Sequence, residues 1–477
     1  MRNLLTLALV LGAGCAPKVD HTTAPAALAV RDFTPPAPTS ATLSNGVRVL
    51  LVENHEVPLV YGRIAWLAGG WTDPARQEGL AAVTLDMMDE GAAGRDAAAL
   101  AGALQKLGSG LSTASGDDGA ALAFSSLHRN LGPTLDLVAD VLFRPDFPQA
   151  EWELLRKRRV AGLAAARKDA DSIAARVQDR ILFGDAYRGR YPTEASYGAI
   201  TPDAMRAWWK DHLNADGAVI LVGGDTTLAE LVPLLESRLA AWKGTGAPAA
   251  RPTVASLPQV AAIHFVDRPG AAQSAIRVSN YVARPTDPSW SALVLANVAV
   301  GGQFTARLNM NLREDKGWTY GARSGIVYDH AGGRFTASAG VHTDKTVPAV
   351  REFWREIKDA SGPRPLTALE LKNGRDALVL GRPLQFESPD WRLGQEESAW
   401  RFQLPGDWVP GFTARVDAVT LPDAQGAWNR LAALPMSTLV VGDGNVVRAD
   451  LLALAKEAGL PFVEHDLDGN LVSPTSP

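Results

Sequence analysis

RIAWLAGGWTDP at residues 63–74 and IRVSNYVARPTDP at residues 276–288 are the two stretches that decide the fold of this chain. Both read as a strand that runs into a turn, and both end in Thr-Asp-Pro. Thr72 and Thr286 lie 214 positions apart. A similar strand-to-turn passage at a distance of about half the chain suggests an internal repeat.

Two further pairs support the repeat. GAALAFSSL from Gly119 is matched by GRFTASAGV from Gly333, again 214 positions later. Near the end of each half, AVILVGGDTTLAEL is matched by STLVVGDGNVVRADL, in which Asp225 and Asp443 lie 218 positions apart. Three pairs in one order at nearly one offset indicate a duplication.

Strand and helix patterns are mingled within each half. The first half opens with a hairpin-like pair, SNGVRVLLVEN and then PLVYGRIAWLA. Later periodicities predict strands around 111–128 and at 218–223, and helices over 78–90, 94–107, 131–142, 149–182 and 203–213. Strands that alternate with period two, mixed with helices, favour an α+β fold with a half-exposed antiparallel sheet over a doubly wound parallel one.

Proline-rich and alanine-rich segments divide the chain. We expect a tether at 16–40 and a linker at 244–258, because both lack a core-forming pattern. The expected order along the chain is signal peptide 1–15, tether 16–40, first domain 41–243, linker 244–258, second domain 259–466 and tail 467–477.

The start of the chain, MRNLLTLALVLGAGCAPK, indicates export. Arg2 precedes an apolar run that suits a signal peptide and is too short to span a bilayer. Cys15, the single cysteine of the chain, follows small residues, as in a bacterial lipoprotein signal cleaved before a lipidated cysteine. Gly12 departs from that pattern, and an ordinary signal peptide with a chance cysteine is the alternative. We expect a lipid-anchored protein of the cell envelope, in the outer membrane or on the periplasmic face.

Composition excludes several classes of function. The net charge of −5 and the absence of a basic run interleaved with aromatic residues give no sign of a nucleic-acid partner. No two histidines lie three to five residues apart, so no helix presents two imidazoles on one face. No G-x-S-x-G stands in a strand–turn–helix setting, and no phosphate-binding glycine loop is present.

The strongest local motif is VGGQFTARLNMNLREDKGWTYGARS at residues 300–324. A glycine pair precedes a helix expected from Phe304 to about Asp315, and Gly317 serves as its C-cap. Arg313 then lies at the helix end and Tyr320 on the next strand. An arginine fork binds a carbonyl or carboxylate, and a tyrosine hydroxyl can stabilise an oxyanion. A surface helix with clustered charges, followed by a core tyrosine, is the alternative interpretation.

Together, the repeated halves, the run from Gly301 to Gly321 and the helix GLAAVTLDMMDEG (Gly79–Gly91) resemble the pitrilysin, or insulinase-like, metallopeptidase family. Within it the chain is similar to the short bacterial two-subunit type related to mitochondrial processing peptidase. The resemblance covers nearly everything from residue 40 to 465. It implies two α/β-roll domains, each an antiparallel sheet flanked by helices, that enclose a clam-like cavity.

The resemblance also implies where a catalytic zinc site would lie. Active members carry H-x-x-E-H on the first-half helix, with two histidines as zinc ligands and the glutamate as base. Those positions fall on Ala82, Leu85 and Asp86, so neither imidazole nor the base is present. A further glutamate ligand would lie about eighty residues on, where RKRRVAGLAAARKD has no acid before Asp169. The resemblance therefore implies no catalytic residue and no zinc in this chain.

The second half keeps its motif. In the family, the matching arginine and tyrosine hold the substrate backbone opposite the zinc, which implies a substrate-binding role for Arg313 and Tyr320. We expect a zinc-free subunit of an exported peptidase, with zinc in a partner of the same family and a peptide or unfolded polypeptide as substrate. Two alternatives remain: a non-enzymatic peptide-binding or assembly protein of the envelope, and a self-sufficient metallopeptidase with a relocated site.

Overall fold

The computed structural model describes residues 33–244, 260–330 and 332–472. Cys15 with its signal peptide, most of the tether and nearly all of the linker lie outside the described residues. The first strand, β1 (Thr39–Thr42), begins two residues inside the segment predicted as tether. None of the helices in the described ranges combines the length and the apolar character of a membrane span.

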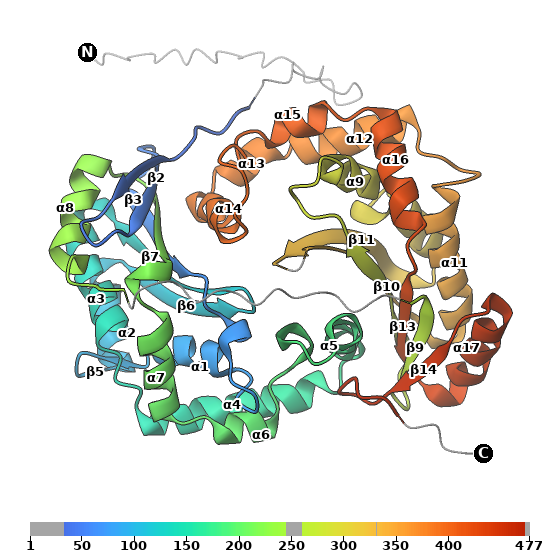
Figure 1. Ribbon diagram of the computed structural model, residues 1–477, viewed down its shortest axis with the longest axis horizontal. Coiled ribbons are helices and arrows are strands. Elements are labelled where there is room, and N and C mark those ends of the chain that lie inside the picture. The colour runs from blue at the N-terminus through green and yellow to red at the C-terminus, as the bar shows by residue number, and fades with distance from the viewer. Residues whose placement is uncertain (1–32, 245–259, 331, 473–477) are drawn as a thin grey trace, which may run out of the picture. The chain divides into compact units, whose positions relative to one another are not determined.

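The first sheet is built from residues 39–224 and has the strand order β1-β2-β8-β3-β7-β6 (Figure 1). Its remaining strands are β2 (Arg48–Glu53), β3 (Leu59–Trp66), β6 (Gly110–Gly116), β7 (Gly119–Leu127) and β8 (Ala218–Gly224). Buried and half-buried residues alternate along β7, whereas β8 is buried over nearly its whole length. The strand AVILVGG, which has no polar side chain, therefore takes a central place in the sheet.

The hairpin predicted at the start of the first half is wrong. β8 lies between β2 and β3, parallel to the former and antiparallel to the latter. The apolar β8 comes from the end of the half, and a pairing over that distance leaves no local signal in the sequence. The sheet is consequently mixed rather than purely antiparallel.

The second sheet is built from residues 262–465 and has the order β11-β12-β10-β13-β9-β14. Its strands are β9 (Ala262–Asp267), β10 (Gln273–Val282), β11 (Thr319–Asp329), β12 (Gly332–His342), β13 (Ser437–Gly442) and β14 (Phe462–His465). Five strands repeat the first sheet in place and direction, including the parallel pair β9 and β13. The sixth differs, because β14 joins parallel from the C-terminal end whereas β1 joins antiparallel from the N-terminal end. The strand order thus agrees with the duplication inferred from sequence.

Helices flank both sheets. The first half contains α1 (Leu80–Met87), α2 (Ala97–Leu107), α3 (Leu131–Phe143), α4 (Gln149–Ala166), α5 (Ala170–Phe183), α6 (Glu194–Ala199), α7 (Pro202–His212) and α8 (Leu228–Leu239). The second half contains α9 (Trp290–Asn297), α10 (Arg307–Asn309), α11 (Thr346–Asp359), α12 (Ala368–Val379), α13 (Arg382–Phe386), α14 (Pro389–Arg401), α15 (Phe412–Asp417), α16 (Leu421–Ala432) and α17 (Gly444–Ala458).

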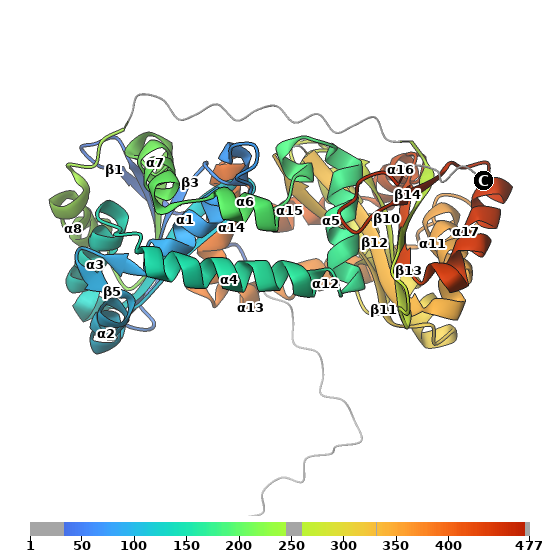
Figure 2. The ribbon, with the colours of Figure 1, turned by 90° about the horizontal axis from the view of Figure 1, so that it is seen from below.

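The long helix predicted over 149–182 is two helices. α4 ends at Ala166, and the Asp169 carboxylate accepts a hydrogen bond of 2.8 Å from the Ser172 amide to begin α5. An aspartate at this position caps the N-terminus of a new helix instead of continuing the old one. Figure 2 shows that α4 and α5 run in clearly different directions.

One helix from each half packs against the sheet of the other half. α5 packs Ile173, Ala174 and Val177 on apolar residues of β9, β10 and β13. In the same way, α14 packs Leu393 on β3 and β8. Figure 1 shows α5 beside β10 and β13. The exchange covers a face of each sheet that its own half leaves apolar.

Equivalent arginines support both exchanged helices. Arg63 on β3 donates to Asp390 at 2.8 Å and to Glu397 at 3.0 Å on α14. Arg277 on β10, 214 positions after Arg63, donates to the Gln178 side chain of α5 at 3.1 Å. The repeat therefore extends to the side chains that join the two halves.

The predicted α+β class, with duplicated sheets flanked by helices, is confirmed. In the first half, one apolar core lies among the sheet, α1, α3, α7 and α8, and includes the fully buried Trp66 and Leu85. A corresponding core in the second half includes Phe335 and Trp428. The first core fixes the position of α1, which carries the vacated metal positions.

Candidate functional site

The helix α1 is held at its N-terminus by Asp73. The buried Asp73 carboxylate accepts hydrogen bonds from the amides of Gly79 at 2.7 Å and Ala81 at 2.8 Å. Gly79 has φ +98, a conformation that favours glycine and turns the chain into the helix. Burial raises the pKa of Asp73 to about 6, although the two amides oppose that shift. The turn Thr-Asp-Pro seen in the sequence thus anchors the first turn of α1.

The three positions that the resemblance predicts to be vacated lie on α1. Ala82 and Asp86 are half-buried and one helical turn apart, whereas Leu85 is 0% exposed and belongs to the core. A small cavity of about 120 Å³ opens beside Ala82 and is also lined by Asp73, Asp117 and other residues. A leucine buried in this way offers neither a base nor access for water.

Asp86 is engaged by a residue that sequence reasoning missed. Arg159 on α4 donates a hydrogen bond to the Asp86 carboxylate, and both side chains are partly exposed. Arg159 lies in the segment where the family's third ligand would be expected. The signal available in the sequence was the basic run RKRR at 156–159, which places cations where an acid would be needed.

These residues do not fit a zinc ion. A catalytic zinc needs about three protein ligands, and Ala82 and Leu85 provide no donor atom. The remaining candidate, Asp86, is bound to the fixed positive charge of Arg159, which repels a metal cation. Among the described residues, no group of three or more His, Cys, Asp or Glu side chains is arranged to hold a metal ion.

The motif at 300–324 folds around buried asparagines. Asn309, 2% exposed, donates to the Phe304 carbonyl at 2.8 Å and accepts from the Ala322 amide at 3.2 Å. Asn311 donates to Glu352 and to Glu356, each at 2.7 Å. The asparagines in RLNMNLR therefore fix the helical segment against β11 and α11, a structural role that spacing alone did not reveal.

The helix of this motif is shorter than predicted. It begins at Arg307 as α10 rather than at Phe304, and a more loosely wound turn continues it over Met310–Asp315. The Gly317 amide donates to the Arg313 carbonyl at 3.0 Å, and Gly317 has φ +64. This left-handed residue after the helix end reverses the chain into β11, as the C-cap assignment predicted.

The two predicted substrate-binding residues lie on consecutive elements and make no hydrogen bond with each other. The Arg313 side chain is 39% exposed, pairs with Glu314 at 3.2 Å and lies 4.8 Å from the Phe304 ring centroid. Tyr320 is 85% exposed on β11 and has no hydrogen-bond partner among the described residues. Both side chains are accessible to a ligand, and the alternative of a core tyrosine does not apply.

Comparison with known proteins agrees with this arrangement. Residues 199–378 match the model of the peptidase M16 inactive domain. The crystal structure of a peptidase M16 inactive domain from Pseudomonas fluorescens has the same fold, with a TM-score of 0.78 and 23% identity over 85% of this chain and 98% of that chain. Residues 199–378 are thus similar to the M16 peptidase family, in agreement with the resemblance of the sequence motifs.

Other similar proteins differ in the activity that their names state. The uncharacterized zinc protease YmxG of Bacillus subtilis is 20% identical over 74% of this chain and 86% of its own length. The non-peptidase homolog YmxG of Helicobacter pylori is 22% identical over 40% of this chain and 45% of its own length. The periplasmic protease PqqL of Escherichia coli shares the fold with a TM-score of 0.75 and 16% identity, over 92% of this chain and 49% of that chain.

Proposed function

We propose that this chain is the zinc-free subunit of an exported M16-type peptidase. It supplies Arg313 and Tyr320 to a partner subunit of the same family that bears the H-x-x-E-H site. The substrate is a peptide or an unfolded polypeptide. The chain itself contributes no catalytic residue and no metal ligand.

One observation carries this proposal: Arg159 is bound to Asp86 where a metal and its ligands would lie. Leu85 is buried in the core and Ala82 has no donor atom for a metal ion. The role that remains for α1 is therefore packing. The loss of every part of the hydrolytic site argues against activity of the chain by itself.

The accessible pair in the second half supports a role in substrate binding. A guanidinium fork can hold a peptide carbonyl, and the exposed Tyr320 hydroxyl can donate to an oxygen that becomes negative during hydrolysis. These contacts orient a substrate without any proton transfer by this chain. This chain matches 49% of the length of the periplasmic protease PqqL, so that protease has room for a second unit of similar size.

The proposal includes a location. The signal-like start and Cys15 support export and a lipid anchor in the cell envelope, in the outer membrane or on the periplasmic face. A lipid anchor would keep the complex beside the membrane where exported, unfolded chains appear.

The alternative is a non-enzymatic peptide-binding or assembly protein of the envelope. Two observations favour it: Arg313 already pairs with Glu314, and Tyr320 extends into solvent with 85% of its surface exposed. In that case the fold is retained for binding, and the two side chains have no role in hydrolysis.

A reconstitution experiment tests the proposal. The chain is purified with a candidate partner that carries H-x-x-E-H, and hydrolysis of an unfolded fluorogenic polypeptide is measured with and without chelator. We expect activity that neither chain shows alone and a loss of at least tenfold with Arg313→Ala. Arg206→Ala, which removes another arginine paired to a nearby acid on a helix, is the matched control. A partner that is equally active by itself would refute the proposal.

A further inference from the structure

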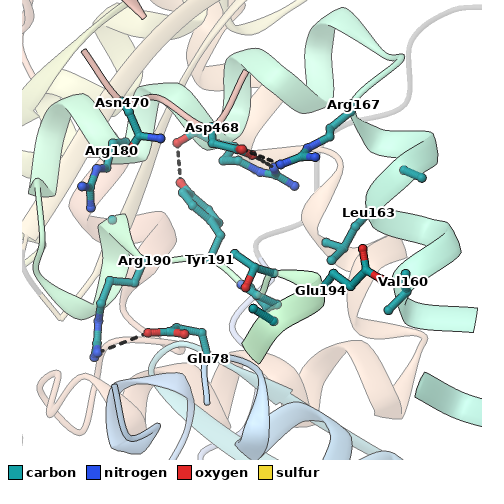
Figure 3. Close-up of a pocket in the computed structure, with 16 residues that line it drawn as sticks. Glu78, Val160, Leu163, Arg167, Arg180, Arg190, Tyr191, Glu194, Asp468 and Asn470 are labelled. Carbon is teal, nitrogen blue, oxygen red and sulfur yellow. Dashed lines mark hydrogen bonds and ion pairs between the residues drawn. The ribbon is translucent and has the colours of Figure 1, made fainter. Parts of the chain in front are cut away.

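A second cavity lies beside the vacated helix and is rich in arginine. Its volume is about 510 Å³, and it is bounded by α4, α5, the segment 189–195 and the loop after β14 (Figure 3). The charged side chains that line it are Arg167, Arg176, Arg180, Arg190, Glu78, Glu194 and Asp468. It shares Glu78, Arg190 and Pro192 with the smaller cavity beside Ala82.

The cavity already holds a carboxylate of the chain itself. Asp468 pairs with Arg167 and, at 2.9 Å, with Arg176, as Figure 3 shows in part. Asp468 lies in a tight turn, because the Asp466 carboxylate accepts from the amides of Asp468 and Asn470, each at 2.9 Å. The two arginines are therefore arranged to bind a carboxylate delivered from outside their own helices.

Arg176 is fixed in place by its surroundings. Its side chain is 14% exposed and its guanidinium lies 5.5 Å from the centroid of the Tyr191 ring. The Tyr191 hydroxyl donates in turn to the Arg176 carbonyl. Such an arginine loses little conformational freedom when it binds an anion.

The other two arginines have partners of their own. Arg180 donates to the Gly184 carbonyl at 3.0 Å and pairs with Asp185 at 2.7 Å. Arg190 pairs with Glu78 across 3.6 Å, and both of these side chains are largely buried. Arg167 and Arg176 are therefore the arginines whose partner, Asp468, a ligand could replace.

The apolar wall of the cavity and the charge of its lining indicate which class of ligand it can bind. Val160, Leu163 and Pro192 supply apolar surface next to the arginines. Once Asp468 is displaced, the four arginines face Glu78 and Glu194 alone, so the cavity offers a ligand two excess positive charges. A carboxylate on an apolar stem suits this lining, because the stem can pack on the apolar wall while the carboxylate replaces that of Asp468 on the arginines.

We propose that this cavity is a binding site for an acidic peptide segment, whose carboxylate takes the place of Asp468 on Arg167 and Arg176. The C-terminal loop then acts as an internal competitor that leaves when the peptide binds. The site uses neither Arg313 nor Tyr320 and requires no partner subunit, so it stands apart from the proposed peptidase function.

Fluorescence anisotropy of a rhodamine-labelled peptide tests the site on the full chain. The probe is an eight-residue peptide of alternating alanine and glutamate, and the same peptide with glutamine in place of glutamate is the control ligand. Asp468→Asn is expected to tighten binding at least threefold, because it removes the competing charge. Arg167→Gln is expected to weaken binding at least fivefold. Arg167 is 50% exposed, so the variant is expected to fold, which thermal unfolding verifies.

Arg206→Gln on α7 is the matched control and should leave the dissociation constant unchanged. Equal binding of the glutamate and glutamine peptides would overturn the proposal, as would unchanged affinity in both Asp468→Asn and Arg167→Gln. Displacement of the peptide by inorganic phosphate at an equal concentration would overturn its assignment to carboxylates.

Discussion

Arg159 on α4 donates a hydrogen bond to the carboxylate of Asp86 on α1, at the position where the family's second zinc-binding histidine would lie. The guanidinium is a permanent cation, and it lies in the segment where the family resemblance predicts a further metal ligand. The positive charge of Arg159 therefore lies where a zinc ion would otherwise be expected, and it pairs with the Asp86 carboxylate. The pair is partly exposed, so we expect it to contribute at most about 1 kcal/mol to stability.

Rebuilding the donor set should restore metal binding. We expect the triple variant Ala82→His, Asp86→His and Arg159→Glu to bind about one zinc per chain, because two imidazoles one turn apart would face a carboxylate on α4. The double variant that retains Arg159 should bind at least about 100-fold more weakly, since it lacks the third ligand and keeps the repelling charge. Zinc titration followed by elemental analysis measures both, and equal affinity of the two variants would show that Arg159 does not face the rebuilt site.

Asp73 should make stability depend on pH in an unusual direction. Its pKa is raised by burial to about 6 from 3.8, so the folded chain binds this proton more readily than the unfolded chain. The stabilisation is therefore complete below pH 4 and is lost as pH rises to about 6. The difference in unfolding free energy between wild type and Asp73→Asn should fall by about 3 kcal/mol across that range. Urea unfolding at several pH values measures it.

Asp287 is the matched control in the second half, because it occupies the same Thr-Asp-Pro turn. Its pKa is lowered, chiefly by the Ser289 hydroxyl at 2.6 Å. A lowered pKa contributes stability above the unfolded value and loses it as pH falls, so Asp287→Asn should show the opposite slope. The same slope in both variants would contradict the assignment.

Asn309 should contribute strongly to the stability of the second half. Asn309→Ala leaves the Phe304 carbonyl and the buried Ala322 amide without their partner. We expect a loss on the order of 3 kcal/mol in unfolding free energy. Asn429→Ala, at an exposed position on α16, should change it by less than about 0.5 kcal/mol. Denaturant unfolding separates these outcomes, and a small effect of Asn309→Ala would show that the motif is not held by this side chain.

Tyr320→Phe separates function from stability. Since the hydroxyl has no partner among the described residues, its removal should change the unfolding free energy by less than about 0.5 kcal/mol. In the reconstituted complex we expect peptidase activity to fall roughly 100-fold, the usual effect of losing one donor to an oxyanion.

Tyr328→Phe provides the contrast on the same strand. It removes a hydrogen bond of 3.0 Å to Ser398, so it should destabilise the chain by about 1 kcal/mol. Activity per folded complex should not change. A normal rate with Tyr320→Phe would favour the non-enzymatic alternative.

Much of the fold was predictable because its signals are local or repeated. The offset of 214 between Thr72 and Thr286 predicted the duplication, and apolar periodicity predicted α1. The pairing of β2 with β8 was not predictable, because nothing in either strand specifies a neighbour so far along the chain. The break between α4 and α5 depends on one capping residue, Asp169, within a continuous helical pattern.

The same distinction applies to the candidate site: some of its features could be predicted from the sequence and others could not. Missing donors at Ala82 and Leu85 could be recognised by position, because a vacated motif keeps its spacing. The pairing of Arg159 with Asp86 could not, since it depends on how α4 is turned against α1. Arg313 and Tyr320 were predicted from the motif, but the spacing did not determine how exposed their side chains are.

The exchange of α5 and α14 has a consequence for how such a chain can exist. Each half leaves one face of its own sheet to be covered by a helix of the other half, so a half produced alone would expose an apolar surface and associate with another copy. The full chain is in effect a helix-swapped homodimer whose two protomers have been fused into one polypeptide. Cleavage between residues 244 and 259 should therefore leave two fragments that remain together and separate only on denaturation.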